Sequence, residues 1–164
     1  MSADFPEDLP VELQSIHISP LFVLRLNVRP LQIIGETPGG YRRIGVVPGG
    51  IFSGQRLAGE VLEGGNDWQS VRADGSTALD VRLALKTDDG ALIGMTYRGV
   101  RHGPLDVISR LEQGEAVEPA AYYFRIAAFF ETAAKQYAWL NRVVAAGVGH
   151  RLPAGPVYSV FELL

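Results

Sequence analysis

Residues Thr77–Val100 read TALDVRLALKTDDGALIGMTYRGV, and this stretch decides the fold. Apolar and polar residues alternate before and after Asp88-Asp89-Gly90, which is the pattern of two half-buried strands joined by a tight turn. A two-residue loop would place Arg98 among the apolar side chains. A three-residue loop with Gly90 in the left-handed conformation gives one clean apolar face, so we expect that loop. This face then holds Leu79, Val81, Leu83, Leu85, Ile93, Met95 and Tyr97.

The opposite face of this hairpin carries charged residues. Asp80 and Arg98 fall opposite or nearly opposite each other on it. If this face is solvated, an ion pair between them contributes little to stability. If it lines an interior, Arg98 can hold an anionic ligand group through two parallel hydrogen bonds. The sequence leaves both alternatives open.

The rest of the chain repeats this pattern of short strands. Nineteen glycines and ten prolines are spread along the 164 residues, and closely spaced turns favour many short strands. One short helix is expected over 105–111, between Pro104 and Gly114. We therefore predict a mostly β protein, an antiparallel barrel or sandwich, with residues 1–19 as an N-terminal arm and 20–164 as a single domain. The other expected strands are 21–28, 41–47, 51–62, 68–72, 122–131, 137–146 and 157–163.

Composition argues against several classes of protein. The net charge of −3 disfavours a nucleic-acid partner, and the absence of cysteine excludes disulfides and thiolate metal sites. No apolar run reaches membrane-spanning length and no secretory signal is visible, so we expect a cytoplasmic protein without a membrane partner. No metal is expected, because His17, His102 and His150 lie far apart in the sequence. No cofactor is expected either, because the glycine pairs match no nucleotide-binding motif.

A second hairpin, near the C-terminus, predicts a binding surface. If Glu131 lies opposite Tyr137, one face of this hairpin is ordinary core and the other mixes aromatic rings with hydrogen-bonding groups. Ligand pockets are lined in this way, with apolar walls and a few placed polar groups. The alternative is an amphipathic surface that faces solvent. The residues of the mixed face that we expect in a pocket are Tyr123, Arg125, Trp139 and Asn141.

The stretch Gly64–Gly75, GGNDWQSVRADG, places an acid and an indole directly after a flexible turn. Trp68 begins a strand there, either as a core residue or as the wall of a ligand cavity. Asp67 is a candidate general acid or base if burial raises its pKa. The alternative for Asp67 is a turn cap that accepts hydrogen bonds from backbone N–H groups.

Several segments together resemble one known family. They are TPGGYRRIGVVPGGIFSGQRLAGEVLEGGNDWQ, LDVRLALKTDDGALI, YRGVRHGP and YYFRIAAFFETAAKQYAWLNRVV. This combination is similar to the domain-of-unknown-function 3237 family, also called uncharacterised protein family 0311, from about Leu21 to Glu162. The resemblance implies a calycin-like antiparallel β-barrel. It implies no catalytic residues, because the family has no assigned activity.

Three functions compete on this basis. The preferred one is a small-molecule-binding barrel whose ligand is apolar or aromatic with an anionic or carbonyl group. The first alternative is a cofactor-independent enzyme for proton-transfer chemistry, of the isomerase, cyclase or lyase type, with Asp67, Asp80 and Tyr123 as catalytic candidates. The second is a protein-interaction module, and a homo-oligomer, most simply a dimer, fits all three. The expected ligand-binding residues are Trp68, Asp80, Arg98, Tyr123, Arg125, Trp139 and Asn141.

Overall fold

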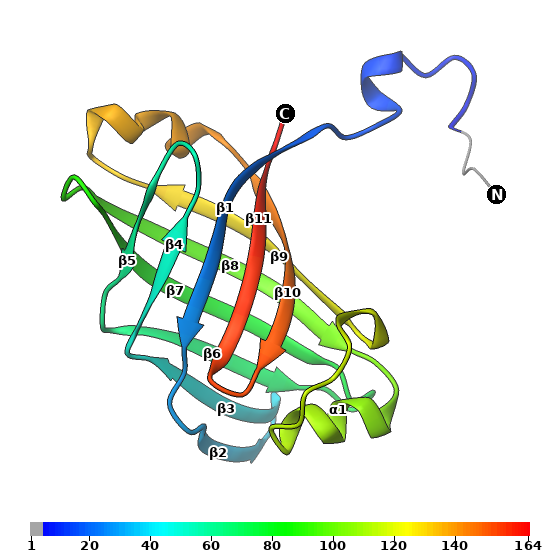
Figure 1. Ribbon diagram of the computed structural model, residues 1–164. Coiled ribbons are helices and arrows are strands. Elements are labelled where there is room, and N and C mark those ends of the chain that lie inside the picture. The colour runs from blue at the N-terminus through cyan, green and yellow to red at the C-terminus, as the bar shows by residue number, and fades with distance from the viewer. Residues whose placement is uncertain (1–4) are drawn as a thin grey trace.

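The computed structural model, which describes residues 5–164, is a closed antiparallel β-barrel (Figure 1). Its sheet runs in the order β2-β3-β6-β7-β5-β4-β1-β11-β10-β9-β8, and pairing of β7 with β8 closes a ring of eight strands. The other three strands, β6, β3 and β2, extend the sheet from one edge of β7. The strands are β1 (Ile18–Asn27), β2 (Gln32–Thr37), β3 (Gly40–Val47), β4 (Gly49–Ser53), β5 (Ala58–Val61), β6 (Gly65–Val71), β7 (Thr77–Thr87), β8 (Leu92–His102), β9 (Tyr123–Glu131), β10 (Ala145–Leu152) and β11 (Gly155–Leu163).

The hairpin of β7 and β8 has the predicted register. Gly90 has a φ of +89°, the left-handed conformation that the three-residue loop requires. Leu85 pairs with Ile93, and Val81 pairs with Tyr97. The whole predicted apolar face is buried inside the barrel, so the prediction of a mostly β, barrel-forming chain is confirmed.

One end of the barrel is filled with side chains. The rings of Phe22 and Phe52 lie 5.5 Å apart there, and Phe130 packs against Phe22 at 6.0 Å. The 3-10 segment η3 (Lys135–Arg142) covers this end and inserts Leu140, which is fully buried. The opposite end is therefore where the barrel has room for a cavity.

The α-helix α1 (Leu105–Glu112) lies at that opposite end, beside the β2–β3 hairpin (Figure 1). It matches the predicted helix over 105–111, with Pro104 directly before it. Val107 and Leu111 form its buried face. Two further 3-10 segments, η1 (Val11–Leu13) and η2 (Pro119–Ala121), complete the elements of the described chain.

Two strand predictions are wrong. Residues 137–146 are not one strand, because η3 occupies 135–142 and β10 begins only at Ala145. The partner of Arg125 is Val148, and a side chain at Gly149 would collide with the Phe124 ring at 2.8 Å, so small residues of β10 fix this register. The predicted strand 51–62 is a hairpin of two short strands, β4 and β5.

Candidate functional site

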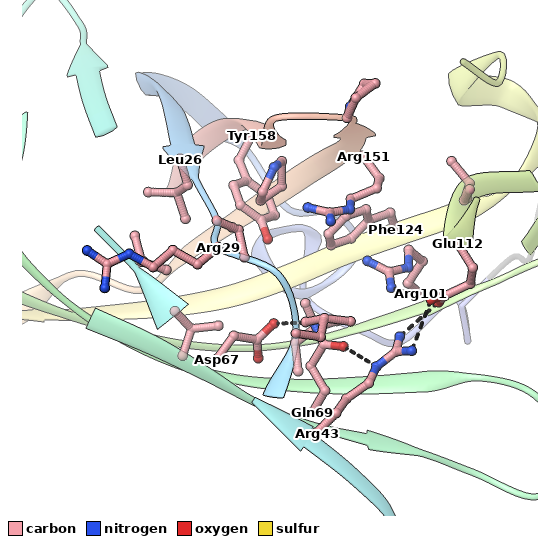
Figure 2. A pocket seen from close by; sticks show the side chains of 18 of the residues that line it. Leu26, Arg29, Arg43, Asp67, Gln69, Arg101, Glu112, Phe124, Arg151 and Tyr158 are labelled. Atoms are coloured by element: carbon pink, nitrogen blue, oxygen red, sulfur yellow. Dashed lines mark hydrogen bonds and ion pairs between the residues drawn. The ribbon is translucent and has the colours of Figure 1, made fainter. Parts of the chain in front are cut away.

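A cavity of about 350 Å³ opens at the end of the barrel beside α1. Its lining comes from segments that are far apart in the sequence: the link from β1 to β2, the inner faces of β3, β6, β7, β8, β9 and β11, helix α1, and the turn between β10 and β11 (Figure 2). This volume lies in the range of small-molecule sites. Its polar lining residues are Arg29, Arg43, Asp67, Gln69, Tyr97, Arg101, Glu112, Arg151 and Tyr158.

Asp67 lies on the inner face of β6, and its side chain is only 8% exposed. Strand alternation directs Asp67 and Gln69 inward together, because successive side chains point to opposite faces. The residue opposite Asp67 on β3 is Gly45, and the side chains of Val28 and Leu31 pack where a Gly45 side chain would lie. Asp67 Oδ2 accepts a hydrogen bond from Gln69 Nε2 at 2.8 Å, and Oδ1 accepts one from the Asp80 backbone N–H at 3.1 Å.

Burial raises the pKa of Asp67 to about 6. The hydrogen bonds from Gln69 and from the Asp80 backbone stabilise the carboxylate and limit this rise, as do the charges of Arg101 and Arg43. Asp67 is therefore a carboxyl group that changes protonation state close to neutral pH. This is the property expected of a general acid or base.

A chain of hydrogen bonds holds Asp67 from behind. Arg43 Nε donates to Gln69 Oε1 at 2.7 Å, so the Gln69 amide must present its NH₂ group to Asp67. The two terminal nitrogens of Arg43 in turn donate to both carboxylate oxygens of Glu112, at 3.0 and 2.8 Å. The chain links helix α1 to β3 and β6, as the dashed lines in Figure 2 show.

Glu112 supplies the negative charge at the outer end of this chain. Burial alone would raise its pKa, but the hydrogen bonds and charge of Arg43, together with the charges of Arg101 and Arg151, outweigh burial. The pKa of Glu112 is consequently below its ordinary value. Glu112 is thus ionised at neutral pH.

Two tyrosine hydroxyl groups meet in the cavity. Tyr97 Oη donates to Tyr158 Oη at 3.2 Å, and both side chains are almost fully buried. Burial raises the pKa of both hydroxyls, so both stay protonated. Phe124 packs edge-on against Tyr158 with ring centroids 5.3 Å apart. In Figure 2 the Tyr158 hydroxyl points toward the side of the cavity that holds Asp67.

The structure brings five of the seven sequence-predicted ligand-binding residues together, but outside the barrel. Trp68 is 43% exposed on the outer face, and the side chains of Asp80 and Arg98 form an exposed ion pair at 3.7 Å. Tyr123 and Arg125 lie beside them, and all five line an outer hollow of about 590 Å³. The expectation that the face with Tyr123 and Arg125 lines the lumen is therefore wrong, because Phe124 and its inward neighbours occupy the interior.

The other two predicted ligand-binding residues lie elsewhere. Trp139 belongs to η3 and packs beneath the Arg56 guanidinium, which lies 4.1 Å from the ring centre. Asn141 closes the loop before η3: its Nδ2 donates to the Thr132 carbonyl at 2.9 Å, and its Oδ1 accepts from the Thr132 N–H at 2.7 Å. Neither residue lines the cavity that contains Asp67.

Of the catalytic candidates from the sequence, only Asp67 lies in this cavity, since Asp80 and Tyr123 are on the outer wall. Sequence reasoning missed most of the site. One signal was available, the spacing of Asp67 and Gln69 on one strand face. The missed residues are Arg43, Gln69, Tyr97, Arg101, Glu112, Arg151 and Tyr158.

Within residues 5–164, no group of three or more histidine, aspartate or glutamate side chains is arranged to hold a metal ion. No helix in the described chain is long and apolar enough to cross a membrane.

The fold and the cavity define a closed antiparallel β-barrel with a polar pocket at one end. The chain belongs to the family described as "Protein of unknown function (DUF3237)", whose model matches residues 16–163, so the resemblance drawn from the sequence is confirmed.

Relatives of known structure share this barrel. UPF0311 protein RPA1785 of Rhodopseudomonas palustris is 33% identical over 144 residues, which cover 88% of this chain and 94% of that protein. Its crystal structure superposes with a TM-score of 0.85 at 30% identity, covering 92% of this chain and 98% of that chain. A "beta-barrel like protein" of Acinetobacter baumannii (ABAYE2633) is 37% identical with a TM-score of 0.81, covering 97% of this chain and 100% of that chain.

One relative carries the name of an activity. "Hydroalkoxylation enzyme phnH" of Penicillium herquei is 28% identical over 127 residues, which cover 77% of this chain and 70% of that protein.

Proposed function

We propose that this protein is an enzyme that moves a proton on a small organic molecule held in the barrel cavity, with Asp67 as the general acid and base. The placement of Asp67 is the observation that carries the proposal. Its carboxyl group is buried in a cavity of ligand size, and burial raises its pKa to about 6. A carboxyl group with a pKa of about 6 keeps its proton in roughly a tenth of the molecules at pH 7 and also releases it readily, so both forms that acid–base catalysis requires are present near neutral pH.

The reaction class that fits best is the addition of a hydroxyl group across a carbon–carbon double bond, and the name of the Penicillium herquei relative supports it. In this reaction protonated Asp67 donates its proton to one alkene carbon as the π bond breaks. The substrate's hydroxyl oxygen forms a C–O bond with the other carbon. The hydroxyl proton then passes to the Asp67 carboxylate, so the acid is regenerated and nothing is oxidised or reduced.

The surroundings of Asp67 suit both halves of this step. Gln69 and the Asp80 N–H each occupy one lone pair of the carboxyl group, which leaves a free lone pair on each oxygen for the proton. The Tyr158 hydroxyl is neutral and receives its hydrogen bond from Tyr97, so its own hydrogen is free to stabilise a ligand oxygen. Phe124 gives the ligand an apolar wall.

A direct test uses two ortho-alkenyl phenols, 2-prenylphenol and 4-hydroxy-3-prenylbenzoate, as probes. The protein should convert at least one of them to the corresponding cyclic ether, measured by chromatography with mass detection. In D₂O the product should gain one deuterium at the new C–H position, because the Asp67 proton exchanges with solvent. Asp67→Asn should lower kcat at least about a hundredfold, the usual contribution of a general acid or base.

The matched control for this test is Asp80→Asn. Asp80 lies on the same wall of the barrel but on its outer face, and only its backbone N–H contacts Asp67. Its substitution should leave turnover unchanged. The absence of product from both phenols, or equal turnover by Asp67→Asn and the wild type, contradicts the proposal.

Binding without turnover is the second candidate function, and the cavity of about 350 Å³, which has the size of a small-molecule site, favours it. Native mass spectrometry of protein purified from its source cells tests this candidate. A small molecule that is retained through purification and unchanged after denaturing extraction, with no turnover of either phenol, supports a binding protein. If the purified protein retains no small molecule and converts a phenol to its cyclic ether, the result supports the enzymatic function.

A further inference from the structure

Arg101 is a buried cation with little inside the protein to neutralise it. It is 6% exposed, at the inward-facing end of β8. Its guanidinium forms no hydrogen bond with any of residues 5–164 that the structure records; its one ion-pair partner among them is Glu112 at 3.7 Å, and the centre of the Phe124 ring lies 5.4 Å away. Glu112 is already engaged by both terminal nitrogens of Arg43. The donors of the Arg101 guanidinium are therefore left without an acceptor in the described part of the protein.

The Arg101 guanidinium is open to the cavity. No fully buried side-chain nitrogen or oxygen of the described chain lacks a hydrogen-bond partner, so the unpartnered nitrogens of Arg101 must border open space. The space they border is the cavity, whose lining includes Arg101. Figure 2 shows its guanidinium next to that of Arg151, on the wall across from Asp67.

Arg151 adds a second positive charge at the same place. The position of its backbone is fixed, because the Arg151 N–H donates to the Tyr122 hydroxyl at 2.7 Å. Burial lowers the pKa of Arg101, and the like charge of Arg151 lowers it further. Two adjacent like charges in a protein interior favour an anion that lies between them.

The charge inventory of the cavity supports the same conclusion. Glu112 neutralises Arg43 through a bidentate pair, and Arg29 pairs with Glu63 at 3.1 Å. Arg101 and Arg151 are then left with Asp67, which even when ionised supplies one negative charge against their two positive charges. The cavity therefore carries a positive charge that its own carboxylates do not balance.

We propose that Arg101 and Arg151 form an anion subsite, and that the ligand of this protein is a small organic acid whose carboxylate binds there. This inference rests on the proposed function, for which it names the class of substrate. The guanidinium fork of Arg101 matches a carboxylate in two parallel hydrogen bonds. Phe124 and Tyr158 contact the apolar body of the ligand, which directs its other end toward Asp67.

The experiment compares two probes of the same shape, 4-methoxybenzoate and 4-methoxybenzamide, by NMR titration of the full-length protein. The wild type should bind the benzoate at least about tenfold more tightly than the amide, because only the carboxylate forms charge-assisted hydrogen bonds with the guanidinium groups. In Arg101→Gln this preference should fall to near one. Arg101→Lys keeps the charge and should restore part of it.

The matched control is Arg98→Gln, which removes an arginine from the same strand on the outer face and should leave the preference intact. Equal affinity of the wild type for both probes overturns the subsite. The subsite is also overturned if Arg101→Gln lowers the melting temperature but leaves the preference for the benzoate over the amide unchanged. Arg101 would then have only a structural role, holding helix α1 through Glu112. If Arg101→Gln does not fold, Arg151→Gln replaces it, with the same expected loss of preference.

The failure of this inference is distinguishable from failure of the proposed function. Tight benzoate binding without turnover of either phenol keeps the subsite and contradicts the proton-transfer reaction. Turnover of neutral 2-prenylphenol without any preference for the benzoate supports the proton-transfer reaction and contradicts the anion subsite. Faster turnover of 4-hydroxy-3-prenylbenzoate than of 2-prenylphenol, lost in Arg101→Gln, supports both.

Discussion

Asp67 and Trp68 are neighbours in the chain, yet their side chains lie on opposite sides of the barrel wall. Asp67 is 8% exposed and faces the cavity, whereas Trp68 is 43% exposed and faces the outside. The two-residue period of the strand separates them. The conspicuous residue of this stretch is thus the outer one, and the residue with a chemical role in our proposal is the acid before it.

The buried carboxyl group of Asp67 should make the protein less stable as the pH rises. Its pKa is raised from 3.8 to about 6 in the folded state, so the folded protein binds this proton more tightly than the unfolded chain does. The resulting stabilisation is complete below pH 3.8 and is lost as the pH rises through 6, by about 3 kcal/mol in total. Asp67→Asn lacks this titration and should be more stable than the wild type at pH 7, but not at pH 4. Urea unfolding across this range measures the difference, and parallel curves for the two proteins contradict it.

Gln69 should tune the proton affinity of Asp67. Its amide donates to Asp67 and lowers the carboxyl pKa, while its oxygen accepts from Arg43. Gln69→Leu removes that donor, so the pKa of Asp67 should rise above 6. Carboxyl ¹³C NMR titration reports this value directly, and the acidic limb of any pH–rate profile should move with it. Ser70→Ala changes the next residue, on the other face of β6, and should leave the titration in place.

The sequence predicts the barrel well but predicts its site poorly, and the reason is physical. Alternation in the hairpin of Thr77–Thr87 with Leu92–His102 determines which side chains share a face, and a clean apolar face must be buried. The face with Tyr123 and Arg125 mixes aromatic and polar residues, so its composition alone does not decide whether it faces the interior or the solvent. Its opposite face, with Phe124, is more apolar and takes the interior when the sheet closes.

The chain from Asp67 through Gln69 and Arg43 to Glu112 was beyond sequence reasoning for a different reason. Arg43 and Glu112 are 69 residues apart and meet only because α1 covers the open end of the barrel. The η3 segment was misread because its apolar spacing resembles alternation. Leu140 is buried as the strand prediction required, but a 3-10 turn buries it.

The glycine at the tip of the hairpin should be needed for its conformation. Gly90 has a φ of +89°, whereas Gly94, four residues later in β8, does not have a positive φ. Gly90→Ala should therefore cost about 1 kcal/mol of unfolding free energy, although no neighbour crowds the added methyl group. Gly94→Ala meets only an ordinary contact at 3.6 Å and should be neutral or slightly stabilising. Equal losses in the two variants would show that backbone conformation is not the cause.

Tyr97 and Tyr158 should behave as a coupled pair. Replacing either by Phe leaves the other buried hydroxyl without its partner, which costs about 1–3 kcal/mol. The double variant removes both hydroxyl groups and should lose no more than the worse single variant. A double-mutant cycle by chemical denaturation measures this coupling, and strictly additive losses would show that the two hydroxyls are independent.

Asn141→Ala should weaken the fold and leave the cavity unchanged. If Asn141 lined a ligand pocket, its substitution would weaken ligand binding and leave the melting temperature of the protein unchanged. The structure predicts the opposite, because both ends of the Asn141 amide group hydrogen-bond to the backbone of Thr132 and close the loop before η3. Loss of these partly solvated bonds should cost about 1 kcal/mol.

Gln136→Ala, in the same segment, loses only a long contact to Asp89 at 3.4 Å and serves as the control. Thermal unfolding should separate the two variants, and 4-methoxybenzoate affinity should not. A loss of benzoate affinity in Asn141→Ala with an unchanged melting temperature would return this residue to a binding site.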